Sequence, residues 1–248
     1  MLIFSFILIC IATAAKGQGE ETSKAIPIGN PILYYSIGVV LMIGVILIAR
    51  YHSPDQVLKR KLKKIKKVSI QDFKDGPLSK VGGKVLPVKN PLFAPVSSKE
   101  CVCYHLIIEK ENDDKTGMIT YDNVSDEVIF KDFFISDHTG LAEIKPEGAS
   151  FLIQKETKKV KKITSEIDER VKALLEERGL ASSANLKSYD LFRVKEGIIE
   201  IGEEVTVSGQ GHWKETADPD LQNRYSKTLV FSHSDQTPLH ISDDPKTF

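Results

Sequence analysis

Two cysteines and a histidine form the pattern in this chain that best fits metal chemistry. Cys101, Cys103 and His105 alternate within CVCYHLIIE, so in an extended strand all three would point to one face. Thiolate sulfur and imidazole nitrogen are preferred ligands of Zn²⁺. A fourth ligand would have to be another histidine, and none lies at a metal-site spacing: His138, His212, His233 and His240.

The alternative is that the two thiols are reduced and fill a hydrophobic core. The spacing favours this alternative, so the sequence predicts no metal ion and no other cofactor, and Cys101, Cys103 and His105 stay weak candidate ligands. A disulfide between the two cysteines is disfavoured. Alternate residues of a strand have Cα atoms about 7 Å apart, which is the limit for bridging.

A second group with reactive side chains is Asp137-His138-Thr139, in the segment SDHTG. Adjacent residues of a tight turn seldom converge on one substrate atom, so we expect Asp137 to accept hydrogen bonds from turn amides instead. The sequence contains no Walker loop, G-x-S-x-G, H-E-x-x-H or dinucleotide-binding motif. It therefore predicts no catalytic residues.

The net charge of zero conceals three regions of different charge. Residues 1–49 hold two basic and two acidic side chains, residues 50–67 hold eight and one, and residues 68–248 hold 24 and 31. The regional charges are 0, +7 and −7, which argues against a nucleic-acid-binding protein with a broad basic face. The acidic third region is expected to be repelled by an anionic lipid surface. Three cysteines are too few for a disulfide framework.

The first apolar run, Leu2 to Ala15, has the length of a signal-peptide core and ends in small residues typical of a cleavage site. It lacks the usual preceding basic residues, so an uncleaved short anchor is the alternative for residues 1–15. A lipoprotein signal at Cys10 is disfavoured because Ile9 is not a small residue.

The second apolar run, residues 32–49, contains no charged residue until Arg50. About 18 residues suffice to cross a bilayer as a helix. Pro31 can begin such a helix, and Tyr34 and Tyr35 lie where interfacial aromatic residues belong. We therefore expect a transmembrane helix over residues 32–49.

The basic segment, which we define as residues 50–67, follows this run directly. Its charge predicts that the rest of the chain is cytoplasmic, in a single-pass protein or a two-pass one if the leader stays attached. Ser53 and Gln56 have capping-box spacing, Pro54 fits the first helical position, and apolar residues recur at helical intervals. A helix lying on anionic headgroups and a charge cluster that only sets topology are both open. The predicted lipid contacts are Lys59, Arg60, Lys61, Lys63, Lys64, Lys66 and Lys67.

Residues 68–248 are long enough for one domain and have mainly the pattern of strands. The predicted strands are 83–88, 101–109, 128–135, 141–144 and a pair within 196–209, with a closing hairpin over 229–241. One amphipathic helix is predicted from Thr164 to Arg178, with Gly179 as its C-terminal cap. Short strands with glycine turns and one inserted helix favour a small OB-like β-barrel, closed or partly closed.

Two further features have two interpretations each. Residues 155–162 (KETKKVKK) form a second basic cluster, either a solvated edge or an additional lipid contact. Trp213 is the only tryptophan. It would contact a partner or lipid if exposed, or cap one end of the barrel if buried.

A resemblance to the GIDE, or "beside a membrane" (BAM), domain family is carried by three ordered segments. They are GGKVLPVKNPLFAPVSSKECVCYHLIIEK, FKDFFISDHTGLAEIKPEGASF and EGIIEIGEEVTVSGQGHW, within residues 80–242. The positions that fit the family pattern are Gly83, Pro91, Cys101, Tyr104, Asp137, Gly140, Glu196, Gly202 and Gly209. The family is best known from membrane-anchored RING E3 ubiquitin ligases of the MULAN or MAPL type.

The resemblance implies a membrane-associated β domain, but the ligase activity of the family requires a RING. A RING binds two Zn²⁺ ions through about eight cysteine or histidine ligands in paired spacings, and residues 68–248 contain two cysteines. The sequence is similar to short members of the family that lack the RING. We therefore expect a non-catalytic interaction module at the membrane that binds a protein or lipid partner. The alternative is the recruiting half of a ubiquitin ligase whose RING is on another polypeptide.

Overall fold

The computed structural model describes residues 31–75, 78–113, 119–159, 166–181, 192–216 and 218–248. Two units separate after Tyr51. In the first unit the described element is α2 (Pro31–Tyr51), a helix of 21 residues that includes the predicted span 32–49. The predicted leader, residues 1–15, lies outside the described residues.

Helix α2 is apolar around its whole circumference. From Tyr35 onward its apolar side chains are exposed within this chain, for example Leu41 at 65% and Ile48 at 62%. Among the described residues no single helix meets length and hydropathy criteria for crossing a bilayer, whereas Tyr35–Tyr51 and Pro54–Lys64 meet them as a pair.

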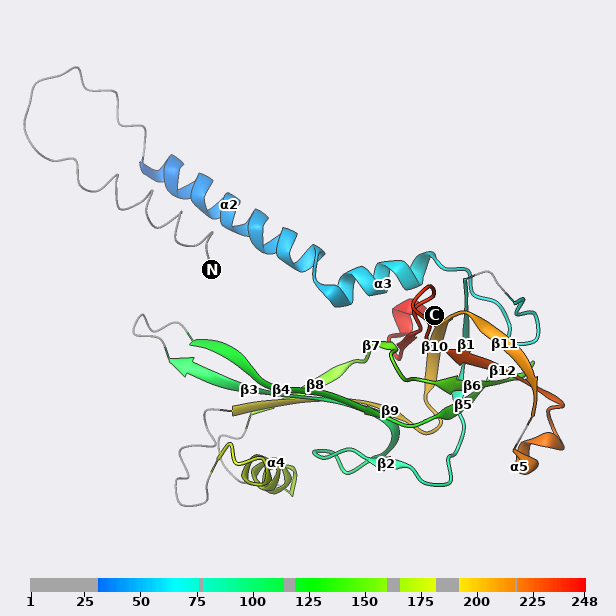
Figure 1. Cartoon of the computed structure of the whole chain (residues 1–248). Coiled ribbons are helices and arrows are strands. Elements are labelled where there is room, and N and C mark those ends of the chain that lie inside the picture. The colour runs from blue at the N-terminus through cyan, green and yellow to red at the C-terminus, as the bar shows by residue number, and fades with distance from the viewer. Residues whose placement is uncertain (1–30, 76–77, 114–118, 160–165, 182–191, 217) are drawn as a thin grey trace, which may run out of the picture. The chain divides into compact units, whose positions relative to one another are not determined.

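The second unit, from His52 onward, is mainly β (Figure 1). Its larger sheet is mixed and its smaller sheet is antiparallel. In the larger sheet, β12 with β6 and β13 with β7 are parallel pairs. Its strands, in spatial order, are β11 (Gly211–Glu215), β12 (Lys227–Ser232), β6 (Leu141–Lys145), β5 (Phe133–Ser136), β1 (Ser79–Val85), β10 (Glu204–Gly209), β13 (His240–Ser242) and β7 (Ser150–Leu152).

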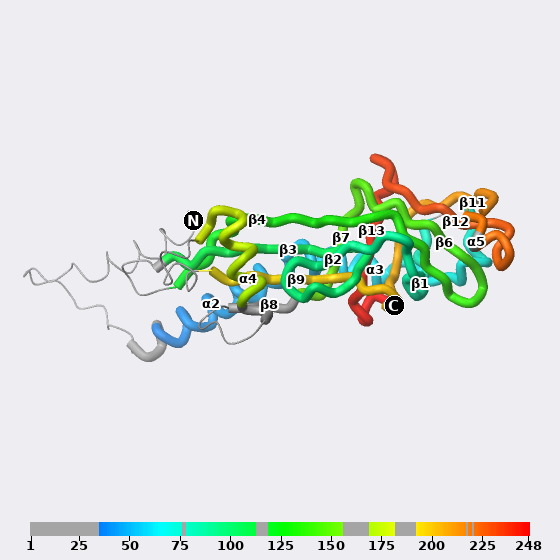
Figure 2. Tube along the Cα trace, turned by 90° about the horizontal axis from the view of Figure 1, so that it is seen from below, coloured from blue at the N-terminus to red at the C-terminus, as the bar shows by residue number. Residues whose placement is uncertain are grey.

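The smaller sheet is built around the long strand β3. One side of β3 pairs with β9, which in turn pairs with β8, and the other side pairs with β2 and then β4. The ranges are β2 (Leu92–Phe93), β3 (Glu100–Asp113), β4 (Ile119–Phe130), β8 (Lys155–Lys159) and β9 (Phe192–Glu200). Figures 1 and 2 both show β3, β4 and β9 side by side as a long ribbon.

The mainly β prediction is confirmed, but a closed OB-like barrel is wrong, because the described strands form two open sheets. Closure needs every strand to have neighbours on both sides, whereas β4 and β8 end one sheet and β11 and β7 end the other. With 14 residues in β3 and 12 in β4, this hairpin is also longer than typical strands of five or six residues.

Two predicted strand assignments are also wrong. The predicted strand 128–135 is broken at Lys131 and Asp132, so that β4 and β5 belong to different sheets. The two strands predicted within 196–209 are confirmed as β9 and β10, although they lie in different sheets. Strands β12 and β13 do not pair with each other, so residues 229–241 form no hairpin.

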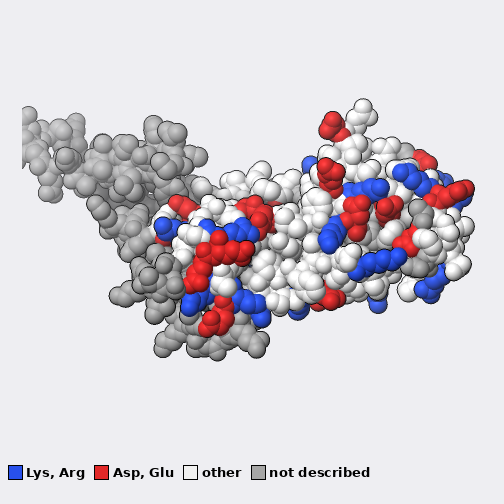
Figure 3. Space-filling model, turned by 60° about the horizontal axis from the view of Figure 1, so that its bottom comes forward, with Lys and Arg blue, Asp and Glu red and all other residues white. Residues whose placement is uncertain are grey.

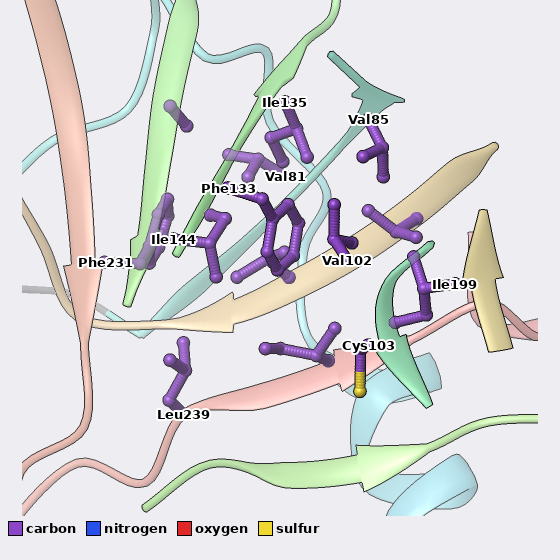
Figure 4. Close-up of a cluster of buried hydrophobic side chains, with 14 of the residues drawn as sticks. Val81, Val85, Val102, Cys103, Phe133, Ile135, Ile144, Ile199, Phe231 and Leu239 are labelled. Atoms are coloured by element: carbon purple, nitrogen blue, oxygen red, sulfur yellow. The ribbon is translucent and has the colours of Figure 1, made fainter. Parts of the chain in front are cut away.

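The main core lies between the larger sheet and the first residues of β3 (Figure 4). Val102 and Cys103 of β3 and Ile199 of β9 contact side chains of the larger sheet such as Phe133 and Phe231, and all five are fully buried. Because β3 contributes residues to this core and then continues into the ribbon, it joins the two sheets.

A second core lies between the ribbon and α4 (Glu166–Glu177). Leu106 and Ile108 of β3 pack there against Val171 and Leu175 of α4. Gly179 adopts a φ of +66° after the helix, which confirms the predicted glycine cap. The predicted helical residues 164 and 165 lie outside the described residues.

Candidate functional site

The basic segment contains a helix that packs against the β domain. This helix, α3 (Pro54–Lys64), contacts β7 and the C-terminal 3₁₀ helix η2 (Pro245–Thr247). Leu62 of α3 is fully buried, and Lys59 forms an ion pair with Asp244. Leu62, on the apolar side of α3, therefore packs against protein and not lipid, while the contact of the α3 lysines with headgroups stays a prediction.

A buried lysine of the larger sheet holds the end of α3. Lys80 is 4% exposed, and its Nζ donates to the carbonyl oxygen of Leu62 at 3.0 Å and to that of Thr247. Burial lowers the pKa of Lys80, and the positive charge of Lys67 lowers it further. The two carbonyl dipoles offset part of the cost of burying the amine. Because one carbonyl belongs to Leu62 and the other to Thr247, Lys80 joins the basic segment to the C-terminus.

The predicted lipid contacts divide into two groups. Lys59 and Arg60 are half-buried, and Lys59 is paired with Asp244. The exposed members are Lys61, Lys63, Lys64, Lys66 and Lys67. Ser53 is the N-cap residue and Pro54 begins the helix as predicted, but the Ser53 side chain makes no capping bond, so the capping box is wrong. The docked segment thus presents five lysines to its surroundings.

The turn between β5 and β6 attaches the next part of the chain to the domain. Asp137 Oδ2 accepts from the backbone N–H of Ile70 at 2.8 Å. Its Oδ1 accepts from the N–H groups of Thr139 at 3.0 Å and Gly140 at 3.1 Å and from the Thr139 hydroxyl at 2.6 Å. The Thr139 hydroxyl oxygen also accepts from the Gln71 N–H at 3.2 Å. The turn interpretation of Asp137 is confirmed.

The electrostatics of this turn do not resemble a catalytic trio. Burial alone would raise the pKa of Asp137, but the hydrogen bonds from Thr139, Ile70 and Gly140 outweigh it, so the pKa is lowered. His138 is exposed with a φ of +73°. Asp137 and Thr139 are used to hold the turn and residues 70–71, and they form no nucleophile–base pair with His138.

Two glycines of the family pattern lie where backbone and neighbour approach closely. A Cβ at Gly140 would lie 2.7 Å from Cγ2 of Ile70, which is fully buried. A Cβ at Gly83 would lie 2.9 Å from the backbone of Ser136. Both glycines therefore allow the β5–β6 turn to approach β1 and residue 70.

A buried glutamate of β9 holds the loop between β2 and β3. Glu196 is 9% exposed, and its carboxylate accepts from the N–H groups of Val96 at 2.7 Å and Ser97 at 2.9 Å. Arg170 of α4 donates from Nε to the Val96 carbonyl oxygen at 2.7 Å. The loop is thereby joined to the sheet and to the helix.

The remaining positions of the family pattern have structural surroundings as well. Tyr104 packs beside the second core, and Pro91 precedes β2. Gly202 has a φ of +85° in the turn between β9 and β10. A Cβ at Gly209 would lie 3.0 Å from Cδ1 of Leu239.

The three candidate metal ligands do not form a common site. A register shift between Cys101 and Cys103 breaks the predicted alternation, and both are free, fully buried thiols. Burial raises the pKa of Cys101 to about 11 and also raises that of Cys103. His105 contacts Asp126 at 2.7 Å between Nε2 and Oδ1. Among the described residues no group of three Cys, His, Asp or Glu side chains is placed to hold a metal ion.

Trp213 is half-buried and packs against the main core. Its Nε1 donates to the carbonyl oxygen of Phe73 at 3.2 Å.

In the second basic cluster, residues 155–159 form β8, an end strand of the smaller sheet, while residues 160–162 lie outside the described residues. Lys155 is half-buried.

Sequence reasoning missed two acidic residues near the C-terminus. Asp244 pairs with Lys59, 185 residues away. Asp243 is 6% exposed, and both its carboxylate oxygens lie 3.0 Å from the backbone N of Gln154. Burial raises the pKa of Asp243 to about 6. It lies in a cavity of about 510 Å³ lined mainly by polar side chains, including Glu196 and Glu203. No local sequence pattern indicated the contact of Asp244 with Lys59 or that of Asp243 with Gln154.

The charge of the domain surface is mixed. On the face drawn in Figure 3, acidic and basic side chains gather in two mixed groups with largely uncharged surface between them. That face therefore has no broad basic field of the kind that attracts nucleic acid.

Comparison of the chain with protein-family models, with curated proteins and with solved structures gave no match.

Proposed function

We propose that this protein is a membrane-anchored, non-catalytic interaction module. In this proposal α2 crosses the bilayer, the exposed lysines of the basic segment lie near anionic headgroups, and residues 68–248 form a cytoplasmic domain that binds a partner. The observation that carries the proposal is the exposed apolar surface of α2, followed directly by a docked helix that presents lysines.

The surface of α2 has no polar side that could face water. A soluble amphipathic helix has one polar and one apolar side, whereas α2 exposes apolar residues around its axis. These residues are Tyr35, Ile37, Val39, Val40, Leu41, Met42, Ile43, Val45, Ile46, Leu47, Ile48 and Tyr51. Removing one large aliphatic side chain from water contributes about 1.5–3 kcal/mol, so lipid around α2 would stabilise it strongly.

The lysines after α2 support the orientation. Positive charge close to the end of a span marks the cytoplasmic side, and an exposed lysine near an anionic surface contributes about 1 kcal/mol. Because α3 is docked through Leu62 and Lys59, its remaining lysines are held on the surface of the domain. The domain would then be kept close to the bilayer by a packed helix.

We further propose that residues 80–242 are a GIDE-like domain used for recognition without ligase chemistry. Support comes from the family-pattern residues, since Asp137, Gly140, Gly83 and Glu196 each make a contact that holds the fold together. In this proposal the pattern preserves an architecture on which a partner-binding surface is built.

The test is protease protection of the full chain in sealed vesicles. We expect the chain to resist alkaline extraction, and external protease to digest residues 68–248 when the cytoplasmic side faces outward. Leu41→Asp with Ile46→Asp should release the chain or expose α2, whereas Leu41→Ala with Ile46→Ala should not. Extraction of the unchanged chain at alkaline pH would refute the anchor. If crosslinking in cells captured neither protein nor lipid on the domain, the interaction module would be refuted.

A further inference from the structure

A lysine-lined trough lies where the basic segment enters the domain. It consists of two adjoining cavities of about 950 and 520 Å³ that share Lys67, Val68 and Ser69. The larger continues along residues 71–74 to Leu78, and the smaller continues over β1 to the β5–β6 turn. We call the two together the lysine trough.

Four exposed ammonium groups line the trough. They belong to Lys66, Lys67, Lys74 and Lys84. Among the described residues none of the four makes an ion pair, although Lys67 Nζ lies 5.8 Å from the ring centroid of Phe248. Four cations without a carboxylate partner are available to an anion.

The acidic side chains of the trough are largely engaged within the protein. Asp72 Oδ2 accepts from the Ser69 hydroxyl at 2.6 Å. The Asp137 carboxylate is occupied by the N–H and O–H donors of its turn. Glu204 is the third acidic residue that lines the trough. The trough is thus lined by four lysines and three acidic side chains, and two of the three carboxylates accept hydrogen bonds from within the protein.

Two glycines and an exposed leucine also line the lysine trough. Gly82 and Gly83 form part of the floor, and a Cβ at Gly82 would lie 2.9 Å from Lys67 Nζ. Glycine therefore lets the Lys67 side chain lie against β1. At the other end Leu78 is 50% exposed. Lysines beside an exposed aliphatic side chain match a ligand with a charged and an apolar part.

We propose that the lysine trough binds the phosphate of an anionic lipid headgroup in the bilayer that holds α2. This inference rests on the proposed membrane anchor. The 11 residues of α3 and the four extended residues around it span at most about 30 Å between Tyr51 and Lys66. The trough can therefore reach the headgroup layer of the leaflet in which α2 ends.

The net charge of −7 for residues 68–248 does not prevent this contact. At physiological ionic strength exposed charges further apart than about 8–10 Å are largely screened. The side chains of the trough itself, four lysines against three carboxylates, then determine how this part of the domain meets an anionic surface more than the carboxylates farther away do. The sequence-based expectation that the whole domain is repelled applies to its other faces.

The only tryptophan of the chain reports on the trough. Trp213 donates to the carbonyl oxygen of Phe73, and Phe73 lines the larger cavity. We would place the full chain in lipid nanodiscs made of phosphatidylcholine alone, or with phosphatidylserine added, and include a headgroup spin-labelled lipid that quenches tryptophan fluorescence. Quenching of Trp213 should be stronger with phosphatidylserine and should fall as salt is added.

A matched pair of strand lysines provides the control. Lys84→Glu in β1 should weaken the contact of the domain with phosphatidylserine at least five-fold, since each lysine at such a surface contributes about 1 kcal/mol. Lys110→Glu makes the same charge change at an exposed position of β3, outside the trough, and should leave quenching unchanged. Lys67→Glu combined with Lys84→Glu should abolish the phosphatidylserine effect.

The outcomes separate the inference from the anchor. If alkaline extraction releases the chain from membranes, the proposed function fails. If the chain stays inserted but quenching is equal in the two lipid mixtures, or Lys84→Glu and Lys110→Glu behave alike, the trough inference is overturned. A change of Trp213 emission on adding inorganic phosphate to the chain in detergent would assign the trough to a free anion, and would overturn the lipid assignment.

Discussion

Replacing Asp137 tests the contact that attaches residues 70–71 to the domain. Asp137→Ala removes the acceptor of three backbone N–H groups, those of Ile70, Thr139 and Gly140, and of one hydroxyl. Water can replace the carboxylate at the exposed Thr139 N–H, but less readily at the partly buried Ile70 and Gly140 N–H groups. Hydrogen bonds to a charged group contribute about 1.5–3 kcal/mol, so we expect a loss of about 3 kcal/mol in the free energy of unfolding.

Asp137→Asn provides an intermediate case. Its amide can keep one oxygen at the Oδ1 position, but an NH₂ group then faces the Ile70 N–H, so we expect a loss of about 1.5 kcal/mol. The folded-state pKa of Asp137 is lowered. Its stabilisation is therefore present above the unfolded pKa of about 3.9 and is lost as pH falls through the folded pKa. The difference between the parent chain and Asp137→Asn should shrink below about pH 4.

The assay is urea unfolding of the full chain in detergent, followed by the emission of Trp213. This probe is suitable because the Trp213 indole N–H donates a hydrogen bond to the carbonyl oxygen of Phe73. The backbone N–H of Phe73 in turn donates to the carbonyl oxygen of Ile70. Asp132→Ala is the control, since Asp132 is an exposed aspartate of the preceding loop. Equal urea midpoints for Asp137→Ala and Asp132→Ala would refute the structural role of the Asp137 carboxylate.

Three further predictions concern packing and burial. Gly140→Ala should cost about 1–3 kcal/mol in unfolding free energy, because the added Cβ meets Ile70 at 2.7 Å; a midpoint unchanged in urea would contradict this. Leu62→Ala should cost about 2–4 kcal/mol and hasten proteolysis within α3, and unchanged proteolysis would show that α3 is not held by Leu62. Burial raises the Asp243 pKa to about 6, so the free energy of unfolding should decrease as pH rises from about 4 to about 6 and the buried carboxyl ionises. Asp243→Asn should remove that fall, and an identical pH profile of thermal unfolding would refute it.

Much of the local structure could be predicted because it depends on short-range patterns. The apolar run gave helix α2, Pro54 gave the start of α3, and Gly179 gave the end of α4. The turn at Asp137 also followed from its residue types. The positive charge of the basic segment could also be predicted, because its lysines are close together in the sequence and stay close in any fold.

The burial of the candidate site could not be predicted, because it depends on partners distant in sequence. Lys59 meets Asp244 across 185 residues, and Lys80 meets the Thr247 carbonyl across 167. An amphipathic helix has the same sequence pattern whether its apolar side faces lipid or protein. The burial of Leu62 against the β domain could therefore not be read from any local pattern.

The sequence by itself determined the main helices, several of the strands and the region where positive charge is concentrated, because these follow from side-chain period and composition. Only the tertiary structure decided which strands become neighbours. Strands with similar patterns joined different sheets, as β4 and β5 did across Lys131 and Asp132, since partner choice depends on non-local packing. The same packing brought residues 66–74 beside Lys84 and the β5–β6 turn, which turned a run of lysines into a trough.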